Sequence, residues 1–155
     1  MPVHERPVGD TVEWYTPPDL FTMLGLDFDL DPASPGAAIV PWVPAARHIT
    51  RGEDGTRGSW RGRVWLNPPY GPAAVPFVER MVAHRNGVML LPARTETQTF
   101  QMAARNADAV CFLRDRLHFI RGDGYQARSS FGSVLFAYGL PSEKALVAAD
   151  LGWTV

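Results

Sequence analysis

Short apolar or alternating runs recur along the chain and are separated by turns that contain glycine and proline. The segment 87–91 is continuously apolar, which is typical of a strand buried on both faces. Other runs alternate apolar and polar side chains, as a half-buried strand does. The pattern predicts strands at Phe28–Asp31, 63–66, 87–91, Ala109–Leu113 and Ser133–Tyr138, a short edge-like piece at 118–120 and a turn at 122–124.

Helical periodicity appears between these runs. Thr16 followed by Pro17 is a helix start and Gly25 is a suitable stop, so a short helix is predicted over 17–24. Further helices are predicted over 72–84, where Val75, Val78 and Val82 share one face, over 97–106, and from Ser142 to about residue 152.

The segment 36–60 has no clear period and several prolines and glycines, so it is predicted to be a long loop. Elsewhere strands alternate with helices. The sequence therefore predicts an α/β fold of three layers around a mixed, mostly parallel sheet. In such sheets ligands bind beyond the carboxyl ends of the strands.

Length and composition are those of one ordinary globular domain. The 155 residues are 46% hydrophobic and 20% charged. We expect a flexible N-terminus over 1–12 and a single domain over 13–155. No stretch approaches the roughly 20 apolar residues of a membrane helix, and the N-terminus lacks the apolar core of a secretory signal. With a single cysteine, Cys111, these features predict a cytoplasmic protein without a membrane partner.

The formal net charge of −1 argues against binding nucleic acid by bulk charge alone. Of the fifteen basic residues only Lys144 is a lysine, and arginine suits bidentate contacts with phosphate. A GC-rich genome accounts for this arginine content equally well. No histidine has a second partner at metal-ligand spacing, so no metal site is predicted.

The segment Asn67-Pro68-Pro69-Tyr70 carries the strongest chemical signal. Two prolines fix two φ angles and Asn67 is held extended, so the loop is rigid. An amide oxygen and a backbone carbonyl can accept both hydrogens of a planar –NH2 group, while Tyr70 stacks on the ring that carries it. Such acceptors free the amine lone pair for attack on a methyl donor. The alternative is a proline-rich strand exit that only turns the chain, but the strand before it and the helix after it favour the chemical role.

Several blocks, in this order, resemble the phage-type DNA N6-adenine methyltransferases. The most specific block runs from Trp60 through Gly62 to Gly71 and contains the Asn67–Tyr70 tetrapeptide. The others are the segments 14–17, 28–33, 90–97 and 116–120, and the resemblance extends from Trp14 to Tyr138. It implies a minimal Rossmann-like class I fold, S-adenosyl-L-methionine as the methyl donor and adenine in DNA as the acceptor.

The resemblance also implies roles for single residues. Asn67 and the Pro68 carbonyl would hold the target amine, and Tyr70 would stack on the flipped base. Asp31 would bind the methionine ammonium group. The other residues implied at the cofactor are Trp14, Tyr15, Thr16, Pro17 and Asp54.

The sequence departs from the wider methyltransferase pattern after Asp31, where P-A-S-P-G replaces a glycine-rich turn. Cofactor binding is therefore expected to depend more on Asp31, Ser34 and the N-terminal segment. A second departure is Glu96, where aspartate is more usual. Contacts with the DNA backbone are predicted for Arg94, Arg116, His118 and Arg121. A solvated side chain is the commoner outcome for an arginine placed like Arg94, and a surface salt-bridge face explains the other three equally well.

Two rival functions stay open at this point. The same tetrapeptide chemistry serves methylation of a protein glutamine amide, and the lost glycine-rich turn motivates a degenerate module that binds DNA without catalysis. The chain is too short for a separate target-recognition domain. Either specificity is loose, or the segments 36–60 and 114–130 read the site, or a homodimer forms. A phage or bacterial host and a role in restriction-modification are further expectations.

Overall fold

The computed structural model describes residues 14–155, so the predicted flexible segment 1–12 lies outside the described part. A seven-stranded sheet has the order β10-β6-β9-β5-β4-β2-β3. Parallel pairing joins β3 (Ala45–His48), β2 (Phe28–Asp31), β4 (Val64–Leu66) and β5 (Gly87–Pro92). The antiparallel half consists of β9 (Ser133–Tyr138), β6 (Ala109–Leu113) and β10 (Gly152–Thr154). The prediction of an α/β fold with a mixed sheet is confirmed.

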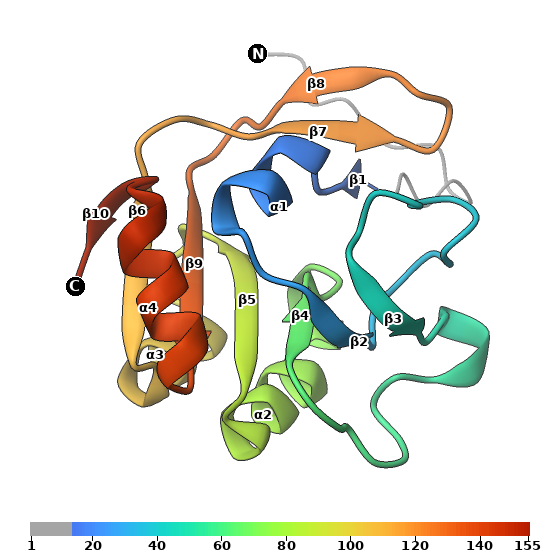
Figure 1. The fold of residues 1–155 in the computed structure, drawn as a ribbon, viewed down its shortest axis with the longest axis horizontal. Helices are drawn as coiled ribbons and strands as arrows, with labels where there is room; N and C mark the ends of the chain where they lie inside the picture. Colours follow the sequence, from blue (N-terminus) through green and yellow to red (C-terminus); the bar gives the residue numbers. More distant parts are fainter. Residues whose placement is uncertain (1–13) are drawn as a thin grey trace.

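Helices cover both faces of this sheet (Figure 1). On one face, α1 (Pro18–Leu24) and α4 (Leu140–Ala149) pack on a cluster that includes Trp65, Leu90 and Leu135. On the other, α2 (Val75–His84) and α3 (Gln98–Asn106) pack on a second cluster. The three predicted layers are therefore present.

Local sequence explains where the helices begin and end. Pro18 occupies the first turn of α1, and Gly25 ends it with φ 63° while its N–H donates to the Phe21 carbonyl. A 3-10 turn, η2 (Gly71–Ala74), leads into α2, so the helix predicted over 72–84 is divided in two. Thr97 caps α3 by accepting from the Phe100 N–H.

The prediction of a loop over 36–60 is wrong for part of this segment, which contains β3 and the 3-10 turn η1 (Arg51–Glu53). β3 is a short edge strand with largely exposed side chains, so it has no apolar alternation to detect. β10, the other edge strand, was missed for the same reason.

A second sheet of three strands has the order β1-β7-β8. The piece predicted at 118–120 as edge-like is its central strand, β7 (His118–Arg121), between β1 (Trp14–Tyr15) and β8 (Gln126–Arg128). That prediction is wrong because the partners of β7 are a two-residue strand and a polar strand that show no period of their own. Figure 1 shows the β7–β8 hairpin across the top of the view, above β1 and α1.

Chain direction creates a switch point in the large sheet. From the carboxyl end of β2 the chain moves to β3 on one side, and from that of β4 it moves to β5 on the other. Ligands of open α/β sheets bind in the crevice at such a point. No helix among residues 14–155 is long and apolar enough to span a membrane.

Candidate active site

A cavity of about 520 Å³ opens at the switch point. Asp31 ends β2 and Asn67 directly follows β4, so parallel pairing of these strands brings both residues to one edge of the sheet. The lining contains most of the predicted catalytic and cofactor residues: Trp14, Tyr15, Thr16, Asp31, Ser34, Asp54, Asn67, Pro68, Pro69 and Tyr70.

Asp31 is a buried carboxylate in this cavity. Strand β2 is irregular, because the N–H groups of Asp29 and Leu30 both donate to the Arg63 carbonyl. The alternation of buried and exposed side chains breaks here, so that the neighbouring residues Leu30 and Asp31 are both buried. The Asp31 carboxylate is 4% exposed and accepts the Ala33 N–H at 3.2 Å. Desolvation raises its pKa to about 7, and the Ala33 N–H opposes this only in part.

The raised pKa of Asp31 makes the stability of the free protein depend on pH. The folded state holds this proton up to about pH 7, whereas an unfolded aspartate releases it near its ordinary value of 3.8. The protonated Asp31 therefore contributes fully to the unfolding free energy below about pH 4. This contribution, about 4 kcal/mol, is lost as pH rises to about 7. Chemical denaturation should show that the unfolding free energy of Asp31→Asn increases relative to that of the wild type as pH rises across this range. Parallel pH profiles for the two proteins would contradict it.

The Asn67 side chain is oriented by Thr16, which comes from a distant part of the chain. The Asn67 Nδ2 donates to the Thr16 Oγ1 at 3.2 Å, so the amide oxygen is directed away from Thr16. Thr16 is itself buried, and its carbonyl accepts the Trp42 Nε1–H at 2.8 Å. Thr16 was predicted as a cofactor residue, but its hydroxyl contacts the Asn67 amide, which was predicted as catalytic.

Tyr70 lies at the mouth of the cavity. Its side chain is 46% exposed, and its ring meets the Phe131 ring edge to face with centroids 5.8 Å apart. Phe131 belongs to the connection between β8 and β9, so that connection packs against Tyr70. Phe131 could not be predicted from the sequence, because a lone aromatic residue in a loop belongs to no periodic pattern.

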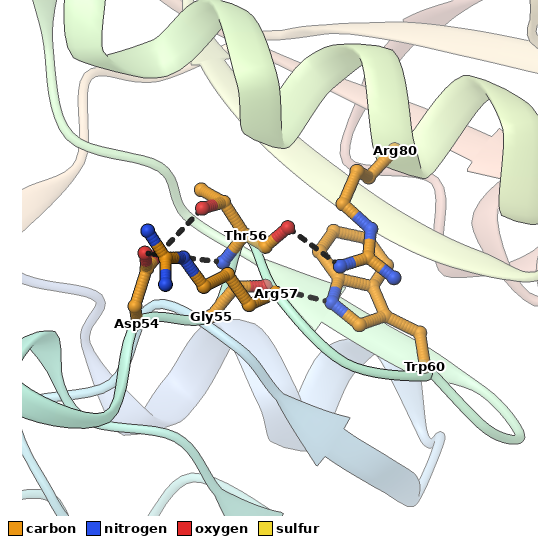
Figure 2. Close-up of polar contacts among 6 residues, drawn as sticks. All are labelled: Asp54, Gly55, Thr56, Arg57, Trp60 and Arg80. Carbon is orange, nitrogen blue, oxygen red and sulfur yellow. Dashed lines mark hydrogen bonds and ion pairs between the residues drawn. The ribbon is translucent and has the colours of Figure 1, made fainter.

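Asp54 and Gly55 line the cavity. Figure 2 shows the polar contacts that hold their turn. The Asp54 carboxylate accepts from the N–H and hydroxyl of Thr56 and pairs with Arg57 at 3.2 Å, and the Thr56 bonds lower its pKa. Arg80 donates to the Thr56 carbonyl, and the Trp60 Nε1–H donates to the Gly55 carbonyl at 2.8 Å. The Asp54 side chain is thus engaged in holding its own turn.

Gly55 allows this turn to approach the chain after β2. A Cβ at this position would lie 1.7 Å from the Pro32 carbonyl oxygen, so Gly55→Ala must displace backbone. We expect a loss of about 2–4 kcal/mol of unfolding free energy in thermal or chemical denaturation. Gly52→Ala is the matched control, since a Cβ there meets nothing within 4 Å. Equal stability of the two variants would contradict this packing.

The remaining predicted residues lie outside this cavity. Pro17, Arg116 and His118 line a second cavity of about 570 Å³ beside α1. Arg121 pairs with Asp123 at 2.5 Å and stacks over Tyr125, and this pairing lowers the pKa of Asp123 to about 2. Arg94 is exposed beyond β5. Among residues 14–155 no three His, Cys, Asp or Glu side chains gather in a way that could hold a metal ion.

Other residues in or beside the cavity were not predicted. Arg51 and Phe77 reach the cavity from η1 and α2. His48 ends β3 beside Asp31, and its Nδ1 lies 2.7 Å from the Ser34 Oγ. Only the parallel pairing of β2 and β3, which the sequence did not predict, would have suggested His48.

Comparisons with known proteins show the family of this chain. A family model described as DNA N-6-adenine-methyltransferase (Dam) matches residues 4–139. A DNA N-6-adenine-methyltransferase of Haemophilus phage HP1 (strain HP1c1) is 30% identical over an alignment of 121 residues, and the match covers 71% of this chain and 67% of the phage protein. No solved structure gives a significant match. The chain belongs to the DNA N-6-adenine-methyltransferase (Dam) family.

Proposed function

We propose that this protein transfers a methyl group from S-adenosyl-L-methionine to the 6-amino group of adenine in DNA. The observation that carries the proposal is the opening of one cavity onto both the buried Asp31 carboxylate and the Asn67 amide fixed by Thr16. The proposal assigns residues 13–155 to a single methyltransferase domain of Rossmann-like class I type. A homodimer stays a prediction.

The residues present fit this cofactor. The cavity volume is within the range of about 300–1,000 Å³ for small-ligand sites. Asp31 is buried, and among residues 14–155 one N–H is directed at its carboxylate, so a cationic group such as the methionine ammonium would compensate its charge. Val40, Val43 and Phe77 supply apolar walls for a flat ring.

In the proposed reaction, the Asn67 Oδ1 and the Pro68 carbonyl accept the two hydrogens of the adenine amine. Their pull draws the nitrogen lone pair out of the ring system and toward the reacting carbon. Tyr70 stacks on the base and holds it in the orientation for in-line attack. When bound, the cofactor supplies an electrophilic methyl group on a sulfonium. The nitrogen forms the new bond to carbon, the carbon–sulfur electron pair stays on sulfur, and the amine proton is released to water.

The target base must leave the duplex to reach Asn67, which costs a few kcal/mol. We propose that Arg116, His118 and Arg94 help to hold the DNA backbone, because these side chains are exposed and none has an ion pair in the described part of the chain. Arg128 faces His118 across β7 and β8 and extends this group. Arg121 contributes less, since Asp123 already neutralises it.

Thr16→Val is expected to lower kcat about tenfold and to leave the cofactor dissociation constant nearly unchanged. The variant keeps the side-chain volume but removes the oxygen that accepts from the Asn67 Nδ2, so the amide is free to rotate. Steady-state kinetics and calorimetry measure the two effects, and Thr16→Ser should restore kcat. A large change in cofactor affinity with normal kcat would contradict this role.

The proposal is tested by incubating the protein with plasmid DNA and cofactor labelled with tritium in the methyl group. After digestion, the label should elute with N6-methyldeoxyadenosine. Label in added protein but not in DNA would favour glutamine methylation. Binding of DNA without transfer at any enzyme concentration would favour a non-catalytic module.

A further inference from the structure

The turn after β2 takes an unusual form in which a serine and a histidine meet. Ser34 lies in the P-A-S-P-G segment, is 4% exposed and lines the cavity with Asp31. Its N–H donates to the Ile49 carbonyl at 3.1 Å, and the Ile49 N–H donates to the Asp31 carbonyl at 2.9 Å. These bonds continue the β2–β3 pairing beyond the strands, so the turn is held against the end of β3.

The Ser34 hydroxyl has three hydrogen-bonding positions, one hydrogen and two oxygen lone pairs. One lone pair accepts the Gly36 N–H at 3.0 Å. The His48 Nδ1 lies 2.7 Å from the same oxygen. One of the three positions remains for a ligand, and the direction of the bond with His48 determines which one it is. If His48 accepts the hydroxyl hydrogen, Ser34 offers a lone pair to the ligand. If His48 donates, Ser34 offers its hydrogen.

The surroundings favour His48 as the acceptor. Burial lowers the pKa of His48, so the imidazole is neutral at neutral pH and has one nitrogen able to accept. Asp31, which faces His48 across β2 and β3, brings a second acceptor to the same end of the cavity. Two neighbouring acceptors match a ligand group that has several hydrogens to donate.

We infer that His48 is a positioning residue of the cofactor site: it accepts the Ser34 hydroxyl hydrogen and so directs a Ser34 lone pair, beside Asp31, to the α-ammonium group of the bound cofactor. This inference rests on the proposed function. It assigns to the serine–histidine pair the support that a glycine-rich turn would otherwise give.

The test is calorimetry on the full chain with two probes, S-adenosylhomocysteine and methylthioadenosine, which lacks the amino-acid portion. Ser34→Ala and His48→Leu should each weaken S-adenosylhomocysteine binding about tenfold, and the double variant should be little worse than either. His48→Asn should retain most of the affinity, because its side-chain oxygen can accept the same hydrogen. Methylthioadenosine should bind all four variants as it binds the wild type, and this binding also shows that the variants are folded.

Three outcomes would overturn the inference. His48→Leu could bind S-adenosylhomocysteine as the wild type does, or the variants could weaken both probes equally, which indicates general damage to the cavity. The losses of binding free energy in the two single variants could also add fully in the double variant, which would show that His48 does not act through Ser34. A wild-type protein that binds neither probe would instead contradict the proposed function, and this inference with it.

Discussion

Asn67→Ala is expected to lower kcat by a factor of about 10²–10³. The variant removes the amide oxygen that accepts an amine hydrogen in the proposed transition state. The dissociation constant of S-adenosyl-L-methionine should stay within about twofold, because the lost interaction stabilises the reacting amine and not the cofactor. Single-turnover transfer of the labelled methyl group measures the first quantity and calorimetry the second.

The control for this variant is Gln101→Ala. Gln101 carries the same amide group on the exposed face of α3 and contacts the Thr95 carbonyl at 2.7 Å, outside the cavity lining. Its removal should leave methyl transfer unchanged. Full activity of Asn67→Ala would show that the rigid tetrapeptide does not hold the target amine.

Asp31→Asn is expected to weaken cofactor binding about 10- to 100-fold at pH 8, since the variant loses the charge but can still accept the Ala33 N–H. In the wild type, affinity should fall as pH drops below about 7, because binding a cation then requires Asp31 to release its proton. The fall should approach tenfold per pH unit and should be absent in Asp31→Asn. Calorimetry from pH 5.5 to 8.5 measures both effects.

Asp29→Asn provides the matched control on the same strand. Its carboxylate is exposed and accepts the Arg63 N–H at 2.7 Å, and it does not line the cavity. Cofactor affinity and its pH dependence should match the wild type in this variant. If Asp31→Asn behaves like Asp29→Asn, the cationic end of the cofactor does not bind at Asp31.

The sequence predicted the elements whose side chains enter the core. Buried strands such as Ser133–Tyr138 carry continuous apolar runs, and the end of α1 is marked by a glycine. The short polar strands β3, β8 and β10 were not predicted, because what defines them is pairing with a neighbour and not a hydrophobic pattern. The central position of β7 was missed for the same reason.

The site was predicted where chemistry is local in the chain and missed where it depends on tertiary contacts. Asp31 ends one predicted strand and Asn67 directly follows another, so their position at the sheet edge could be predicted. The bonds from Asn67 to Thr16 and from Ser34 to His48 join residues 51 and 14 positions apart, and no pattern along the chain encodes them.

The most direct test of the account is a crystal structure of the full chain with S-adenosylhomocysteine. We expect the ligand's amino group within hydrogen-bonding distance of the Asp31 carboxylate, and its sulfur in the same cavity facing the Asn67 amide. Ligand seated in the second cavity beside α1, or an Asn67 side chain turned out of the shared cavity, would contradict the central claim that Asp31 and Asn67 serve one reaction.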